Sequence, residues 1–487
     1  MSRKILIIGG GVAGLSAGVY ARMNGFDTEI FEMSAIPGGL CTAWKRKGYT
    51  FDGCIHWLTG CNTGSSYYPL WEEIGLIQGK QFHYFNYVSR YTAENGKEIT
   101  IHSDPDILEK DLVALAPEDT TAIRKIMKDI RKLHKHEVPA DISMKSLPSL
   151  IPVLRFFYKY RCSCTEFAKR FKNPELKKMV EEIFNWHDMS ISFTLWSIAQ
   201  MGSRTGGYPI GGSIPLMESV EKKFIRLGGI IHYRTTVKKI LTENGKATGV
   251  LLADGTTHHG DIIISAADGH ATIFDWLDGK YGGERIRKVY EKLTPFPSVV
   301  FVNFGIDADY SSEPYHFSYL LRTPITISDK KITRLEVKNH SYDPTLYPKG
   351  KSIFSILFEG NWEYWKDMQH DSDSYQSLKK KIEEDVTGAL EEKFPQIRSQ
   401  IEVTDVATPL TYVRYTGNWK GSYEGWLFTK KSIMVRIPST LKGLDNFYMV
   451  GQWTSPGGGL PSGLITARSM IKKICKKEKV KFTTNRD

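Results

Sequence analysis

Three glycines and one glutamate near the start of the chain have the types and spacing of a dinucleotide-binding site. Gly9, Gly11 and Gly14 follow an apolar run, and Glu32 follows a second one at 28–31. In a strand–turn–helix unit, such glycines give a tight turn, a close backbone approach to a pyrophosphate, and close helix–strand packing. The helix N-terminus offers unpaired N–H groups to the phosphates. We assign to Glu32 the hydrogen bonds to the adenosine ribose hydroxyls.

A second glycine pair lies six and seven residues after Glu32. Gly38 and Gly39 let another loop pass close to the same pyrophosphate. A fold that binds only NAD has no need of this loop, because its second mononucleotide-binding half holds the rest of the cofactor. The pair therefore argues against NAD alone as the dinucleotide.

The residues around this pair resemble the FAD flavoproteins of the amine oxidase and phytoene desaturase superfamily. Segments 36–39 (Ile-Pro-Gly-Gly) and 48–52 (Gly-Tyr-Thr-Phe-Asp) are most similar to the plant-type carotenoid isomerases. Segment 53–60 (Gly-Cys-Ile-His-Trp-Leu-Thr-Gly) is more similar to the retinol saturases, the all-trans-retinol 13,14-reductases. The resemblance implies FAD as the cofactor. Phytoene desaturases usually carry Arg after the glycine pair, whereas this chain has Leu40.

The end of the chain resembles the other half of the same site. A short strand ends at Gly451, and the glycine-rich turn 455–463 leads into a predicted helix at 464–474. Pro461 suits the first turn of a helix. The resemblance implies that this helix N-terminus faces the flavin pyrimidine and ribityl chain, where its dipole favours negative charge. Most relatives carry an acid where this chain has the neutral Gln452.

A third cofactor segment lies in the middle of the chain. The turn 208–213 precedes an amphipathic helix, and the dipeptides at 244–245 (Asn-Gly) and 254–255 (Asp-Gly) predict a β-meander that starts at Val237. The resemblance implies that the backbone of Val237 touches the adenine. It also implies that the chain returns to the dinucleotide-binding sheet at 265–268.

These segments predict an α/β protein with a Rossmann-type FAD-binding domain of the glutathione-reductase type, interleaved with a mixed-sheet substrate domain and a helical lid. The expected parts are FAD-binding at 1–75, 201–285 and 436–487 (the last with the C-terminal helix), a substrate-domain hairpin at 76–105, a basic helical insert that forms a lid or faces a membrane at 106–200, and the remaining substrate domain at 286–435. The residues expected at the cofactor are Gly9, Gly11, Val12, Ala13, Gly14, Glu32, Met33, Gly38, Gly39, Leu40, Gly53, Ile55, His56, Val237, Ala266, Gly451, Gln452, Gly459, Leu460 and Pro461.

The composition excludes several other classes of protein. No run of about 18 apolar residues is free of charge, so we expect no membrane-spanning helix. Residues 1–4 pass directly into the first strand without a signal-peptide pattern. Six cysteines show no metal-binding spacing, so we expect no metal, reduced thiols and a cytoplasmic protein. No nucleic-acid-binding module accompanies the positive charge.

The positive charge is concentrated in one segment. Residues 124–180 hold fifteen Lys or Arg and five Asp or Glu, an excess of ten against a net charge of +11 for the chain. Cations and aromatic residues alternate at 147–161. Basic amphipathic helices of this type bind anionic lipid surfaces. The alternative is a helical lid whose charges form a solvated face.

The remaining segments are expected to build a substrate lobe rich in aromatic residues. We predict a hairpin from 82–91 and 98–102, and further strands at 297–305, 352–358 and around 412–415. Such a sheet can line a long apolar tunnel against the flavin, although most single aromatic residues serve core packing.

His56 is the candidate catalytic residue, because it follows the segment that the resemblance places beneath the flavin ring. A neutral imidazole can protonate a substrate carbon opposite hydride delivery or stabilise a polarised substrate. The alternative role is a hydrogen bond within the cofactor loop. Asp52 is a weaker acid–base candidate, and a carboxylate at this place more often fixes the loop.

We therefore expect an FAD-dependent oxidoreductase that desaturates, saturates or isomerises C–C double bonds of a lipophilic, polyene or isoprenoid substrate. Without a second G-x-G-x-x-G motif for NAD(P)H, the flavin needs an external electron donor or acceptor, which is a quinone, oxygen, NAD(P)H or a protein. Two alternatives stay open on the same fold: a flavin amine oxidase, and a non-redox lipid-binding protein similar to the Rab GDP-dissociation inhibitors.

Overall fold

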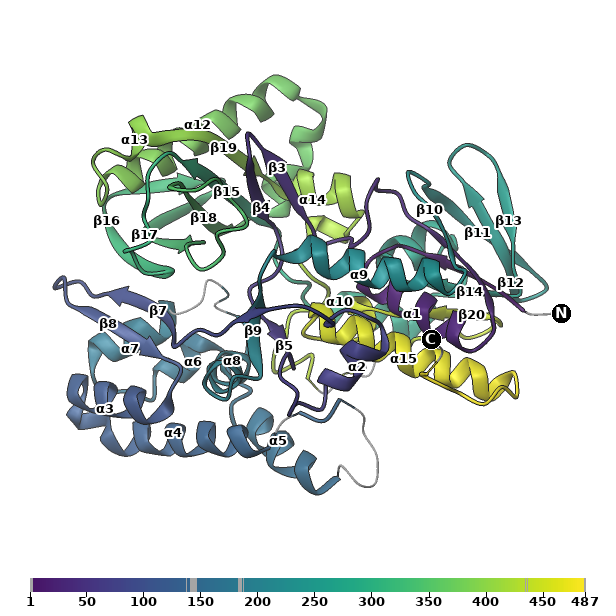
Figure 1. Ribbon diagram of the computed structural model, residues 1–487, viewed down its shortest axis with the longest axis horizontal. Helices are drawn as coiled ribbons and strands as arrows, with labels where there is room; N and C mark the ends of the chain where they lie inside the picture. Colours follow the sequence, from purple (N-terminus) through teal and green to yellow (C-terminus); the bar gives the residue numbers. More distant parts are fainter. Residues whose placement is uncertain are drawn as a thin grey trace.

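The computed structural model describes residues 3–485 apart from 137, 141–146, 183–185, 187, 434 and 436. Met1 and Ser2, expected to lead into the first strand, lie outside the described residues. Figure 1 shows three lobes: a Rossmann lobe that carries both termini, a sheet lobe, and a helical insert built on the same side as the sheet lobe.

The Rossmann lobe contains a five-stranded parallel sheet in the order β10-β2-β1-β14-β20. The strands are β1 (Lys4–Ile8), β2 (Asp27–Phe31), β10 (Ile230–His232), β14 (Ile262–Ser265) and β20 (Phe447–Met449). Helices α1 (Val12–Met23), α9 (Ser213–Arg226) and α15 (Gly459–Lys477) share one apolar core with the sheet. The central strands are continuous apolar runs because both of their faces are covered.

A three-stranded meander covers the opposite face of that sheet. It consists of β11 (Val237–Glu243), β12 (Lys246–Leu252) and β13 (Thr257–His259), paired antiparallel. Leu6 and Ile8 of β1 and Phe31 of β2 pack in one cluster with Val237 and Val250 of the meander. The predicted hairpin dipeptides at 244–245 and 254–255 lie at its two turns.

The sheet lobe is a seven-stranded mixed sheet in the order β19-β15-β18-β17-β16-β7-β8. Its strands are β7 (Tyr87–Thr92), β8 (Glu98–His102), β15 (Val299–Ile306), β16 (His316–Ile327), β17 (Lys330–Asn339), β18 (Ser352–Glu359) and β19 (Ile401–Ala407). Helix α12 (Ser372–Glu391) packs its buried side chains into the same core. Small strands link the lobes: the hairpin β3 (Ala43–Arg46) and β4 (Tyr49–Asp52), and β5 (Leu58–Thr59) and β6 (Phe82–His83), which both pair with β9 (Gly206–Pro209).

The helical insert has an apolar core of its own. Its helices are α3 (Pro105–Leu115), α4 (Thr120–Lys135), α5 (Leu147–Lys159), α6 (Cys164–Ala168), α7 (Pro174–Glu182) and α8 (Ile191–Gly202). Helix α4 buries Ile123, Ile126, Ile130 and Leu133, a spacing that places one apolar face inward and leaves its cations outside. Among the described residues, no helix combines the length and the apolar character needed to cross a bilayer.

The remaining helices are short or lie at the edges of the lobes: α2 (Tyr68–Glu73), α10 (Glu284–Lys292), α11 (Trp362–Trp365), α13 (Ile397–Gln400) and α14 (Pro409–Thr416).

Two strand predictions need correction. The region around 412–415 is not a strand but part of helix α14. Thr408 caps this helix reciprocally with Thr411, Pro409 occupies its first turn and Gly417 ends it in the left-handed conformation, so these end signals outweigh the strand preference of the residues between them. The predicted strand at 82–91 is interrupted, because β6 pairs with β9 and only β7 pairs with β8.

Candidate functional site

A single cavity of about 710 Å³ is lined by residues of the Rossmann lobe, the sheet lobe and the helical insert. Its wall includes Glu32 and Val237 of the Rossmann lobe, Lys338 of the sheet lobe, and Phe157 and Trp196 of the insert. The volume lies within the range of roughly 300–1,000 Å³ that is common for ligand and cofactor sites. The predicted nucleotide-binding segments and the aromatic walls therefore share one cavity.

The two glycine loops lie side by side at the start of this cavity. Gly11 and Gly38 form an isolated parallel bridge, and the Gly38 N–H donates to the Gly10 carbonyl over 3.0 Å. Gly38 has a φ of +118°, and a Cβ there would lie 2.3 Å from the Cys41 carbonyl oxygen. Two loops without side chains leave backbone N–H groups open to a pyrophosphate.

Glu32 lies at the tip of β2 with only 4% of its surface exposed. Its two carboxylate oxygens accept the Gly10 N–H at 2.6 Å and the Ser34 N–H at 2.7 Å. Both bonds hold the carboxylate in one orientation at the cavity wall. Each carboxylate oxygen has a second lone pair, and these lone pairs suit the two ribose hydroxyls expected there.

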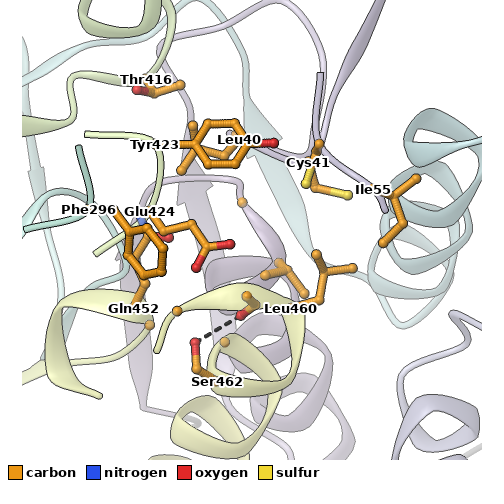
Figure 2. Close-up of a pocket in the computed structure, with 18 of the residues that line it drawn as sticks. Leu40, Cys41, Ile55, Phe296, Thr416, Tyr423, Glu424, Gln452, Leu460 and Ser462 are labelled. Atoms are coloured by element: carbon orange, nitrogen blue, oxygen red, sulfur yellow. Dashed lines mark hydrogen bonds between the residues drawn. The ribbon is translucent and has the colours of Figure 1, made fainter. Parts of the chain in front are cut away.

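The N-termini of α1 and α15 converge on the same wall. Gly463 packs so closely on α1 that a Cβ there would lie 2.6 Å from Cγ1 of Val12. Gly458 is the N-cap of α15 and Gly459 its first residue, both with positive φ, and the Ser462 hydroxyl donates to the Gly459 carbonyl (Figure 2). Two helix N-termini at one cavity make an electropositive region that suits phosphate and the pyrimidine ring of a flavin.

The cavity is lined by all but one of the residues that the sequence predicts at the cofactor. They are Gly9, Gly11, Val12, Ala13, Glu32, Met33, Gly38, Gly39, Leu40, Gly53, Ile55, His56, Val237, Ala266, Gly451, Gln452, Gly459, Leu460 and Pro461. Gly14 does not line it. A Cβ on Gly14 would lie 1.9 Å from the Gly9 carbonyl oxygen, so this glycine serves the contact between α1 and the preceding turn. The assignment of these residues to FAD contacts stays a prediction.

His56 lines the cavity beside a lysine. Its Nδ1 lies 3.3 Å from the Nζ of Lys338, and its Nε2 lies 3.5 Å from the Tyr423 hydroxyl. Desolvation by the surrounding protein, reinforced by Lys338 and His316, holds the pKa of His56 well below its usual value, although the ring is exposed to the cavity. The imidazole is therefore neutral at pH 7, the state that the proposed acid–base role requires.

The carboxylate of Asp52 is held by hydrogen bonds and is not a free acid–base group beside His56. It accepts the backbone N–H groups of Cys54 and Ile55, and both the N–H and the hydroxyl of Ser213. Burial raises its pKa while these hydrogen bonds act in the opposite direction. Asp52 thus ties the segment around Gly53 to the start of α9, which is the loop-fixing alternative.

Among the ionisable residues of the cavity that the sequence analysis missed are Lys338 and Glu424. Lys338 projects from β17, where burial lowers the pKa of its ammonium group to about 8. Glu424 faces the start of α15 (Figure 2), and burial raises its pKa to about 8 while the Gly459 N–H counteracts this. Strand β17 lies between β18 and β16, and its alternation of charged and apolar residues does not distinguish Lys338 from the cations that face solvent, so the sequence contains no signal for it.

The cavity continues between aromatic side chains toward the helical insert. Phe157 of α5 contacts Phe428 edge-on with ring centroids 5.6 Å apart, and Trp186 stacks on Tyr423 at 6.3 Å. Phe193 and Trp196 of α8 extend the same wall. These walls offer apolar area without hydrogen-bond donors, apart from indole and phenol groups.

The sequence profile of the family described as flavin containing amine oxidoreductase matches residues 12–471. The chain belongs to this family. It is therefore an oxidoreductase, and FAD is its cofactor, as the glycine motifs predict. The glycine loops, Glu32 and the two helix N-termini are compatible with this cofactor.

Similar proteins have been described in plants, bacteria and archaea. The chain is 24% identical over 93% of its length to a chloroplastic prolycopene isomerase of Daucus carota, of which 77% is covered. It is 25% identical over 96% of its length to a neurosporene-forming phytoene desaturase of Cereibacter sphaeroides, of which 94% is covered. An oxidoreductase of Methanosarcina mazei has a similar fold, with a TM-score of 0.65, 18% identity, and coverage of 96% of this chain and all of that one. The predicted fold class is confirmed.

Proposed function

We propose that this enzyme moves hydrogen at a C–C double bond of a lipophilic polyene, with desaturation, saturation and isomerisation as the possible net reactions. One observation carries the proposal: a single cavity joins the FAD-binding segments at Glu32 to the aromatic wall at Trp196. The names of the isomerase and desaturase relatives support the same chemistry.

FAD, when bound, supplies hydride-transfer chemistry. The chain positions the reacting bond, excludes water through its aromatic walls, and holds a neutral imidazole at the site. Lys338 donates to Nδ1 of His56, which leaves the proton on Nε2. His56 can then deliver that proton to a carbon or stabilise a developing negative charge on the substrate.

The experiment uses the purified enzyme with its flavin reduced chemically under anaerobic conditions. A mixture of cis- and all-trans polyenes is added, and the products are identified by mass spectrometry and chromatography. Loss of two hydrogens, gain of two hydrogens, or a change of geometry at constant mass separates the three outcomes. An enzyme that holds FAD but leaves every polyene unchanged contradicts the proposal.

Amine oxidation is the second candidate because the family is described by it. One observation disfavours it here. Among the described residues that line the cavity, Lys338 is the only lysine or arginine, and it lies beside His56. A protonated amine next to that ammonium group meets repulsion in a site of low dielectric constant.

We propose further that α5 lies on a membrane surface from which the substrate enters. Ile151, Leu154 and Tyr158 are 48%, 57% and 61% exposed at a spacing of three and four residues, so they form one apolar face. The Arg161 guanidinium lies 3.8 Å above the Tyr158 ring, where it can meet lipid phosphate. Phe157 of the same helix lines the cavity, which supports a short path from lipid to flavin.

The electron donor or acceptor is proposed to be external: a quinone, oxygen, NAD(P)H or a protein. This proposal rests on the single strand-linked glycine motif in the sequence.

A further inference from the structure

The apolar cavity contains one group of polar side chains with an unmatched charge. Five carboxylates and one ammonium group line its wall among the described residues. The carboxylates have local donors, whereas no carboxylate of the described residues lies within ion-pair distance of the Lys338 ammonium group. Lys338 is half-buried in the cavity wall. A charge that has lost part of its hydration and has no counter-charge is costly, and a ligand of opposite charge lowers that cost.

Each carboxylate has partners that do not include Lys338. Backbone N–H groups bind Glu32, and the Cys54, Ile55 and Ser213 donors bind Asp52. The N–H groups of Ala271 and Trp419 bind Asp268. Glu336 pairs with Nε2 of His316 at 2.8 Å, and the Gly459 N–H faces Glu424.

Lys338 itself contacts weak acceptors. Its Nζ lies 3.3 Å from Nδ1 of His56 and stands 5.7 Å and 5.9 Å from the ring centroids of Tyr208 and Tyr342. The ammonium group has three N–H donors, and His56 accepts one of them. The other donors face the cavity wall and two aromatic rings.

His56 has one N–H donor of its own, on another side of the ring. Because Nδ1 accepts from Lys338, Nε2 carries the proton, and it lies 3.5 Å from the Tyr423 hydroxyl. That distance is at the limit of a hydrogen bond, and the Tyr423 hydroxyl already donates to the Gly53 carbonyl over 3.2 Å. The Nε2–H group points away from Lys338, because the two nitrogens of an imidazole face different sides of the ring, so Lys338 is the charged donor that lacks a strong acceptor.

We infer that Lys338 binds the carboxylate of a long-chain unsaturated acid, whose apolar chain lies along the aromatic wall. The inference rests on the proposed function and narrows its substrate class. A carboxylate supplies the missing charge and accepts a charge-assisted hydrogen bond from the ammonium group, while the Nε2 proton of His56 stays available to the substrate carbon. A pure hydrocarbon leaves Lys338 unpaired, and an amine places a second positive charge beside it.

The test measures binding rather than turnover. The probes are cis-parinaric acid, a fluorescent conjugated tetraene acid, and its methyl ester, added to the FAD-loaded enzyme. We expect the acid to bind at least about tenfold more tightly than the ester. Lys338→Met should remove this difference by weakening the acid alone. Lys331→Met, on the exposed part of the same strand, is the matched control and should keep the difference.

The outcomes separate this inference from the proposed function. If acid and ester bind equally to the FAD-loaded enzyme, or if Lys338→Met weakens both alike, the carboxylate site is wrong and the polyene proposal stands. A Lys338→Met enzyme that loses FAD and keeps the preference for the acid also overturns the inference, because the lysine then serves the cofactor. If the enzyme binds neither probe, the proposed function fails together with the inference.

Discussion

The two ends of the cavity differ in the groups that form their walls. At the nucleotide end, the wall consists mainly of backbone groups. They belong to the glycine loops around Gly11 and Gly38 and to the N-termini of α1 and α15. At the substrate end, side chains from three lobes form the wall, among them Phe157, Lys338 and Tyr423. A backbone site depends on where a Cβ is absent, whereas a side-chain site depends on which residues distant strands bring together. The first end is therefore specified locally and the second only by the whole fold.

The largest effect is expected from the glycines of the nucleotide end. Gly11→Val should abolish FAD binding, because the side chain blocks the approach of the backbone to the pyrophosphate. The protein should stay folded, since φ of Gly11 is −72° and an added Cβ lies 3.6 Å from the Gly38 carbonyl oxygen. Gly14→Val should instead prevent folding, since its Cβ would lie 1.9 Å from the Gly9 carbonyl oxygen. Flavin absorbance and circular dichroism distinguish the two. Gly388→Ala in α12, where a Cβ meets nothing within 4 Å, is the control. An FAD-loaded Gly11→Val protein would contradict the backbone description.

The second prediction concerns His56 at the junction of the two ends. If it acts as the acid, His56→Ala should lower turnover by roughly 10²–10⁴-fold at unchanged FAD content. His56 contacts Lys338 and Tyr423, so a purely structural role would lower flavin content instead. Turnover is therefore divided by bound flavin, and the exposed His259→Ala serves as control. An unchanged normalised rate removes His56 from the chemistry.

The third prediction concerns the outer side of the substrate end. Arg155→Gln combined with Arg161→Gln should weaken binding to anionic vesicles roughly 30-fold, since each cation near such a surface contributes about 1 kcal/mol. Lys159 is left in place because it pairs with Asp129. Co-sedimentation with vesicles measures the effect, and Lys349→Gln with Lys380→Gln, both exposed on the sheet lobe, provides the control. If neither added salt nor the double substitution changes the affinity for anionic vesicles, the insert is a solvated lid.

The smallest effect is a pH dependence. Burial lowers the pKa of Lys338 to about 8, with Asp52 and Cys54 acting to raise it. His56 stays neutral because its own pKa is lowered. The protonated ammonium binds a carboxylate, so affinity for parinaric acid should fall roughly tenfold from pH 7 to pH 9. The methyl ester should show no such change. A rise in affinity with pH would contradict the charge assignment.

The same division explains what the sequence predicts and what it misses. The motif from Gly9 to Glu32 is local, with fixed spacing between its residues. All the residues that it predicts line the cavity, apart from Gly14. Strands β16 and β17 were not predicted, although they pair with each other through a short turn at 328–329, because β16 lacks a regular alternation of buried and exposed residues. Lys338 was missed together with β17, whereas Glu424 lies outside the strands, in a loop whose position depends on the whole fold. Helix α14 was predicted as a strand because Tyr412 and Val413 favour strands, while the decisive cap lies at Thr408.

Helix α5 carries the exposed face of Ile151, Leu154 and Tyr158 on one side and Phe157 against the cavity on another. If lipid covers that face, the enzyme meets its substrate only at a surface. Its rate would then follow the mole fraction of substrate in the bilayer rather than the bulk concentration. Diluting the substrate with inert phospholipid at constant total substrate would slow turnover, and adding more buffer would not.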